Sequence, residues 1–117
     1  MLDLDSYRDA WHRRFAEEER QLKKRARAAR LVASALAVML REQFGAERVW
    51  LIGSLARATF DVHSDIDIVA EGLEPAQFFH VCACLQNAAG DFAIDLAPFE
   101  DLRPLARSAL DREGVPL

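Results

Sequence analysis

VWLIGSLARATFDVHSDIDIVAEG, residues 49–72, sets the architecture of this 117-residue chain. Its first four residues form an apolar run, which predicts a buried strand that ends at Gly53 and Ser54. Residues 55–58 have the composition of a short helical turn, and a polar loop follows over residues 60–64. Residues 65–70 then alternate acidic and aliphatic side chains before becoming wholly apolar. The stretch therefore predicts two strands joined by a helical turn and a loop.

Two aspartates open the second predicted strand. Residues i and i+2 of a strand point to the same face, so Asp65 and Asp67 are expected side by side while Ile66 and Ile68 face the core. Carboxylates this close repel each other unless one is protonated or a cation lies between them, and Mg²⁺ prefers such oxygen ligands. The pattern favours a cation site. The alternative is that Asp65 merely caps the strand and Asp67 pairs with Arg57.

The two elements together resemble a known signature. Gly53-Ser54-Leu55-Ala56-Arg57, a short loop and Ser64-Asp65-Ile66-Asp67 are similar to the G-S-x-x-R and S-D-x-D elements of the polymerase-β-like nucleotidyltransferases. The size resembles the minimal nucleotidyltransferase (MNT) branch of HEPN/MNT antitoxin type, and the resemblance covers about residues 46–117. The family usually has glycine where this chain has Ala58. Either this turn is right-handed or the phosphate loop is slightly altered, because a left-handed alanine costs roughly 1 kcal/mol.

The resemblance implies transfer of a nucleoside monophosphate, expected to be AMP from ATP, to a hydroxyl acceptor. It implies a third carboxylate on the following strand, and Asp95 matches that position and is the candidate to help deprotonate the acceptor. One or two Mg²⁺ ions would be held by the catalytic aspartates, Asp65, Asp67 and Asp95. The nucleotide phosphates would be contacted by four residues, Gly53, Ser54, Arg57 and Ser64.

The N-terminal segment is predicted to be helical. Residues 4–44 contain no proline or glycine, which favours one helix of about forty residues or two helices broken near Arg20. Tyr7, Trp11 and Phe15 recur one turn apart, beyond the reach of a core that begins near Val32. This stripe could fold back on the sheet, pair with a second copy or receive a protein partner. The basic segment 23–30 separates the stripe from the domain, which favours pairing with a second copy or with a protein partner. We therefore divide the chain into a helical extension, 1–44, and a nucleotidyltransferase domain, 45–117.

The remaining elements complete an α/β pattern. Pro75 opens a helix that closes by residues 87–91, and residues 92–97 form a third apolar strand. Pro104 opens a last helix that stops at Gly114, and residues 115–117 are a short tail. Asp95 interrupts its apolar strand, and acids are rarely buried without a partner. The order predicts a small mixed β-sheet packed by helices, with Asp95 beside the first two aspartates.

Composition narrows the class of protein. The net charge of −4 argues against a general nucleic-acid surface. The basic residues at 20–30 fit a solvated helix face with acid–base pairs or, alternatively, a patch for RNA or an acidic partner. The longest apolar stretch, residues 31–40, is too short to span a bilayer, and the N-terminus does not resemble a signal peptide. Cys82 and Cys84 lie two apart on a predicted helix and cannot bridge there. A reduced, cytoplasmic protein is expected.

Three functions fit these observations. The first is a nucleotidyltransferase that modifies a partner protein, as the family's small antitoxins modify a HEPN ribonuclease toxin. The second is a binding module of the same fold without catalysis. The third is a small-molecule enzyme of the aminoglycoside type. Enzymes of that third type usually carry an added helical domain that forms the acceptor pocket, so the sequence favours an acceptor on a separate protein.

Overall fold

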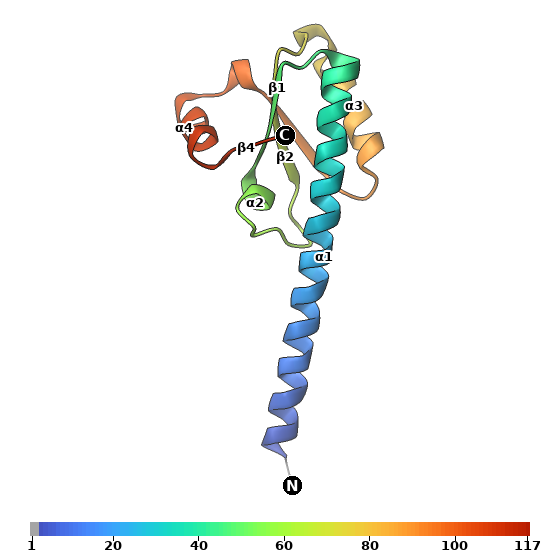
Figure 1. Cartoon of the computed structure of the whole chain (residues 1–117), viewed down its shortest axis with the longest axis vertical. Coiled ribbons are helices and arrows are strands. Elements are labelled where there is room, and N and C mark those ends of the chain that lie inside the picture. The colour runs from blue at the N-terminus through green and yellow to red at the C-terminus, as the bar shows by residue number, and fades with distance from the viewer. Residues whose placement is uncertain (1–2) are drawn as a thin grey trace.

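A single long helix, α1 (Leu4–Phe44), makes up the first third of the protein (Figure 1). The computed structural model describes residues 3–117; residues 1 and 2 of the predicted N-terminal segment lie outside the described residues. Asp3 caps the helix by accepting the backbone N–H groups of Asp5 and Ser6, both at 3.1 Å. Gly45 ends it in a left-handed conformation, with φ 72°.

The alternative of two helices broken near Arg20 is wrong, because α1 runs for 41 residues without interruption. Glu17 supports the helix at the expected break. Its carboxylate pairs with Arg20 and accepts a 2.9 Å hydrogen bond from Gln21, one turn further along. With no proline or glycine in the segment, nothing local favours ending the helix before Gly45.

Four strands form one mixed sheet in the order β3-β2-β1-β4, which confirms the predicted fold class. The central strand β1 pairs antiparallel with both β2 and β4, and β2 pairs parallel with β3. The strands are β1 (Arg48–Ile52), β2 (Ile66–Glu71), β3 (Ile94–Pro98) and β4 (Val115–Pro116).

Helices cover both faces of this sheet. In Figure 1, α1 and α3 lie on one side of the sheet and α4 lies on the other. Pro75 and Pro104 stand in the first turns of η1 and α4, where a missing N–H costs nothing. The helical segments after α1 are α2 (Gly53–Ala56), η1 (Pro75–Gln77), α3 (Phe78–Ala89), η2 (Phe99–Asp101) and α4 (Pro104–Glu113).

The main core lies between the sheet and the pair α1 and α3. Ile66 and Ile68 are fully buried, as their alternation with the aspartates predicts. They pack in one cluster with α1 and α3 side chains that include Leu36, Leu40 and Leu85. Burial of each such side chain contributes about 1.5–3 kcal/mol, so this layer fixes the position of β2 and of the acidic residues that precede and interrupt it.

Residues 115–117, which the sequence predicts to be a short tail, pair with the sheet. Val115 and Pro116 form β4, which pairs with β1 at Leu51 and Trp50. The backbone N–H of Leu117 then donates to the carbonyl of Val49 at 2.9 Å. A two-residue strand is too short to show a periodicity, and proline is tolerated at a sheet edge.

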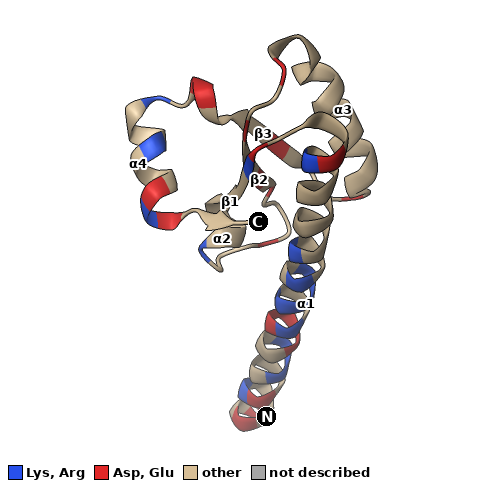
Figure 2. Cartoon of the chain, turned by 45° about the horizontal axis from the view of Figure 1, so that its top comes forward, with Lys and Arg blue, Asp and Glu red and all other residues tan. Residues whose placement is uncertain are grey.

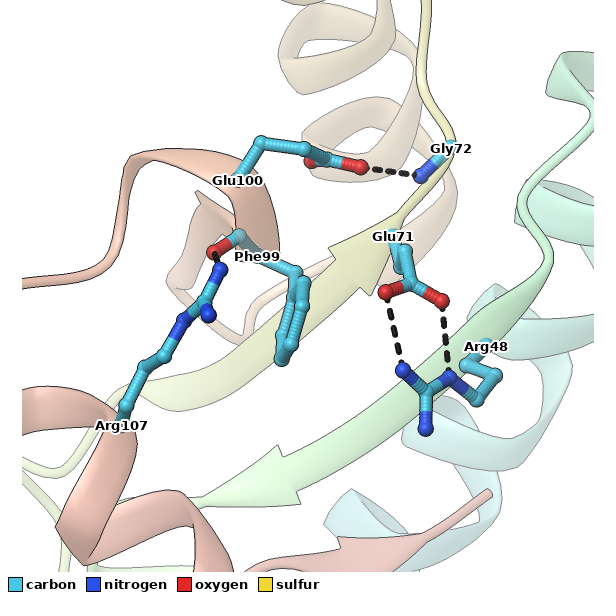
Figure 3. Close-up of polar contacts among 6 residues, drawn as sticks. All are labelled: Arg48, Glu71, Gly72, Phe99, Glu100 and Arg107. Atoms are coloured by element: carbon cyan, nitrogen blue, oxygen red, sulfur yellow. Dashed lines mark hydrogen bonds and ion pairs between the residues drawn. The ribbon is translucent and has the colours of Figure 1, made fainter.

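A polar cluster holds the end of the sheet farthest from the aspartates (Figure 3). Arg48 and Glu71 form a two-pronged ion pair at 2.7 and 2.9 Å. The carboxylate of Glu100 accepts the backbone N–H of Gly72 at 2.7 Å, which ties η2 to the residue that follows β2. Trp50 stacks on Phe99, with 5.2 Å between ring centroids, and is half-buried. These contacts anchor η2 across β1 and β2.

The first half of α1 extends well past the sheet, and the protein measures 68 × 30 × 18 Å along its principal axes (Figure 1). Buried positions on α1 begin at Ala29. Among residues 3–117, no helix is both long and apolar enough to cross a membrane.

Candidate active site

The three predicted aspartates lie at one end of neighbouring strands. The parallel register between β2 and β3 places Asp95 directly opposite Asp67, and Asp65 immediately precedes β2. Register partners in a parallel pair point to the same face of a sheet. Asp67 and Asp95 therefore share the face opposite the Ile66 and Ile68 side chains. Asp67 is half-buried, whereas Asp65 and Asp95 are exposed.

Asp67 is the electrostatic centre of this group. Its burial and the neighbouring carboxylates of Asp95 and Asp65 raise the pKa of Asp67 from 3.8 to about 6, against the opposing effect of Arg57. Each cause disfavours the charged form, because desolvation and like charges both make a carboxylate harder to ionise. At neutral pH Asp67 is thus an ionised but destabilised carboxylate, which is a favourable starting point for binding a cation.

We expect Asp67→Asn to stabilise the metal-free protein by about 1 kcal/mol at pH 8, after discounting for solvent screening, and to have little effect below pH 4. A raised pKa means that the folded state holds the Asp67 proton more tightly than the unfolded state does. The wild type therefore loses stability as the pH rises from about 4 to above 6. Urea unfolding in EDTA across this range checks the difference, and identical pH profiles for the two proteins would contradict it.

Gly53 lies directly against the Asp67 carboxylate. A Cβ atom placed on Gly53 would stand 2.1 Å from Asp67 Oδ2, and the backbone φ of Gly53 is +74°. Both the space and the conformation therefore require glycine at the first residue of α2. The sequence assigned Gly53 only to phosphate contact; its packing on Asp67 depends on how β1 and β2 pair, which residue spacing does not show.

The turn after Arg57 is left-handed. Ala58 has φ 61°, so the alternative of a right-handed turn is wrong. The turn is closed by the backbone N–H of Thr59, which donates to the carbonyl of Ser54 at 2.8 Å. An alanine in this conformation is strained by about 1 kcal/mol or more, so the chain keeps the loop shape that glycine would adopt without strain.

We predict that Ala58→Gly raises the free energy of unfolding by about 0.5–1 kcal/mol, because it relieves the strain of φ 61°. It should leave nucleotide binding unchanged or improve it. Ala83→Gly, on an exposed position inside α3, is the matched control and should cost about 1 kcal/mol instead. Thermal and urea unfolding of both variants measure the contrast. A destabilised Ala58→Gly protein would show that the methyl group makes a stabilising contact.

Arg57 and Ser64, both predicted to contact phosphate, have other partners in the structure. Arg57 Nη1 lies 3.4 Å from a carboxylate oxygen of Glu113 in α4, a residue that the sequence analysis did not single out. The alternative in which Arg57 forms an ion pair with Asp67 is therefore not what the structure has. The Ser64 hydroxyl accepts the backbone N–H of Asp61 at 3.0 Å and lies 3.2 Å from its Oδ1. Ser64 thereby closes the loop before Asp65. Its contact with a nucleotide stays a prediction.

The donor chemistry of the site suits Mg²⁺, although the side chains are not gathered around a point. Within residues 3–117, no three His, Cys, Asp or Glu side chains stand close enough together to hold a metal ion as they are. The three carboxylates nevertheless supply the hard oxygen ligands that Mg²⁺ prefers, and two of them interact with Asp67 strongly enough to raise its pKa. Because Asp65 and Asp95 are exposed, their side chains can rotate without disturbing the core.

In sequence, no family model and no curated protein matches the chain. Solved structures do. A structure described as a minimal nucleotidyltransferase superposes with a TM-score of 0.66 at 24% identity, covering 79% of this chain and 95% of that one. The chain has the minimal nucleotidyltransferase fold. At this identity the likeness establishes the fold alone.

Toxin–antitoxin structures share this minimal nucleotidyltransferase fold. A mutant of the toxin–antitoxin MntA–HpeT has a TM-score of 0.61 at 23% identity and covers 72% of this chain and 69% of that one. A toxin–antitoxin structure with AMP-PNP has a TM-score of 0.61 at 20% identity and covers 70% of this chain and 69% of that one. The fold expected from the residues around Gly53 and Asp65 is therefore the fold observed.

Proposed function

We propose that the protein is a Mg²⁺-dependent nucleotidyltransferase that moves AMP from ATP to a hydroxyl group on a partner protein. The observation that carries this proposal is the position of Asp67, half-buried against Gly53 and placed in register with Asp95 on the adjacent strand. A carboxylate with its pKa raised to about 6 by burial and by its neighbours costs stability, and active sites are where such groups concentrate. The minimal nucleotidyltransferase fold supports the same assignment.

The reaction is an in-line substitution at phosphorus. The acceptor oxygen forms a bond to the α-phosphorus of ATP, the bond from that phosphorus to the bridging oxygen breaks, and pyrophosphate leaves. Asp95, exposed at the edge of the site, takes the proton of the acceptor hydroxyl. Asp65, Asp67 and Asp95 would hold one or two Mg²⁺ ions, which when bound neutralise the phosphates and polarise the α-phosphate.

The nucleotide is expected to lie over the start of α2. There the backbone N–H groups of Gly53 and Ser54 and the Ser54 hydroxyl are proposed donors to phosphate oxygens. Arg57 is half-exposed, and its weak pairing with Glu113 leaves it able to turn toward a phosphate. Ser64 is proposed to act on the nucleotide from the loop that it closes with Asp61.

A protein acceptor fits this site better than a small molecule. A groove of about 910 Å³ lies between α1 and loop residues 61–63 and includes none of the three aspartates. Asp65 and Asp95 are exposed, so a hydroxyl on another protein can reach them. By resemblance the acceptor is a HEPN-type ribonuclease toxin, and the toxin–antitoxin structures of the same fold support that choice. Because the proposed reaction consumes ATP, we expect it to take place in the cytoplasm.

ATP labelled at either the α- or the γ-phosphate tests the proposal. The protein, Mg²⁺ and the product of any adjacent HEPN-type gene are incubated with each label. Label from α-labelled ATP alone should appear on the acceptor and should disappear with EDTA. Calorimetry of ATP binding with and without Mg²⁺ gives a readout that does not need the acceptor. Binding without transfer would favour the non-catalytic module. Loss of both signals would reject the nucleotidyltransferase assignment.

A further inference from the structure

An aromatic stripe on the free half of α1 has no covering element among residues 3–117. Tyr7, Trp11 and Phe15 are 62%, 41% and 59% exposed, and Leu4 beside them is 68% exposed. The rings contact one another along the helix, with centroids 6.4 Å apart for Tyr7–Trp11 and 5.4 Å apart for Trp11–Phe15. Large apolar side chains gathered on one exposed face indicate an interaction surface.

The stripe continues the face by which α1 packs on the domain. At 3.6 residues per turn, Leu4, Trp11 and Phe15 fall on the same side of the helix as the buried Ala29 and Leu40. Packing against the sheet and α3 covers this face in the second half of α1, and the first half extends past the sheet (Figure 1). A second helix laid along the first half would complete the cover.

The stripe also leads into a groove beside the middle of α1. This groove of about 910 Å³ lies between the middle of α1 and loop residues 61–63, with Leu22, Val62 and Phe92 among its apolar walls. Arg25 stands over the Phe92 ring at 4.7 Å, and its buried Nε has no hydrogen-bond partner in the described structure. A helix following the stripe would reach this groove at its end.

Charge along α1 identifies the helix that fits. Residues 3–19 hold six acidic and three basic side chains, whereas residues 20–30 hold six basic and no acidic ones. Figure 2 shows these acidic and basic positions following one another along the exposed part of α1. In an antiparallel pair centred on the stripe, Asp3 and Asp5 come level with Arg20 and Lys23 of the other copy, and Arg8 comes level with its residues 17–19, which are all acidic. A parallel copy would place like charges together.

We propose that α1 of a second copy packs antiparallel on the stripe, with the two helices related by a two-fold axis near residue 13. In this register Trp11 faces Phe15 of the partner subunit, and Leu4 meets the partner's Leu22 at the groove. On one flank Asp5 comes opposite the partner's Lys23, and Arg8 comes opposite the partner's Glu19. Every contact occurs twice, so the surface is self-complementary, as a two-fold interface requires.

Sedimentation equilibrium of the full chain tests this pairing. The wild type should have twice the monomer mass of 13.2 kDa. Trp11→Glu should raise the dimer Kd by at least about 30-fold, the effect of losing a central aromatic contact worth about 2 kcal/mol. Leu31→Glu is the matched control, because Leu31 is 74% exposed on the opposite side of α1, and it should leave the Kd unchanged. Circular dichroism confirms that each variant keeps its helix.

A charge exchange tests the antiparallel register. Asp5→Lys and Lys23→Glu should each raise the Kd by about two- to fivefold, as expected for exposed ion pairs, and the double variant should restore it. In a parallel pair the double variant would bring no such recovery. A monomeric wild type, a Trp11→Glu protein that stays dimeric, or a double variant no tighter than the single ones would overturn the proposal. If the stripe binds only a different protein, the wild type alone would be a monomer.

Discussion

Replacing Asp65 and Asp67 together by asparagine is expected to weaken binding of Mg²⁺-ATP by at least about 100-fold, since each lost charged ligand contributes about 1.5–3 kcal/mol. Asparagine keeps the size of both side chains, so the close packing of residue 67 on Gly53 is preserved. The domain should stay folded and become slightly more stable without metal, because the burial and the repulsion that raise the pKa of Asp67 no longer act on a charged group.

The matched control changes the net charge by the same amount elsewhere. Asp9 and Asp101 are exposed acids on α1 and η2, and their replacement by asparagine should leave binding within about twofold of wild type. Isothermal titration of ATP with Mg²⁺ into the three proteins measures the difference. A double variant at residues 65 and 67 that still binds like the wild type would remove these aspartates from the site.

Gly53→Ala is expected to be the most damaging single substitution at the site. Its Cβ would stand 2.1 Å from Asp67 Oδ2, and the added side chain would also have to adopt φ +74°. Together these effects should lower the free energy of unfolding by about 2–4 kcal/mol. If the domain tolerates the change by moving Asp67, ATP binding should be lost even where the fold survives.

Gly45→Ala separates the two causes. Gly45 has nearly the same φ, +72°, but a Cβ there would meet nothing within 4 Å. It should therefore cost only the conformational penalty, about 1 kcal/mol, and leave ATP binding intact. Urea unfolding and nucleotide titration of both variants check this. Equal effects of the two substitutions would show that contact with Asp67 is unimportant.

Local sequence was sufficient for most of the elements. The alternation of Asp65, Ile66, Asp67 and Ile68 predicted a strand with one acidic and one buried face, and that is how β2 lies. Gly45, Pro75 and Pro104 marked helix ends correctly, because the backbone conformations that glycine and proline favour are local properties. The roles assigned to the site residues in binding and catalysis stay predictions.

Only the tertiary structure decided how these pieces meet. The sequence alone determined strands β1 to β3, the helical character of residues 4–44, the acidic face and the resemblance around Gly53, since each depends on residues near one another in the chain. Four features join segments that are distant in the chain. They are the register of Asp95 with Asp67, the contact of Asp67 with Gly53, the pairing of Arg57 with Glu113, and the strand β4. Such contacts depend on how the sheet packs against the helices, and the spacing of residues along the chain carries no record of that packing.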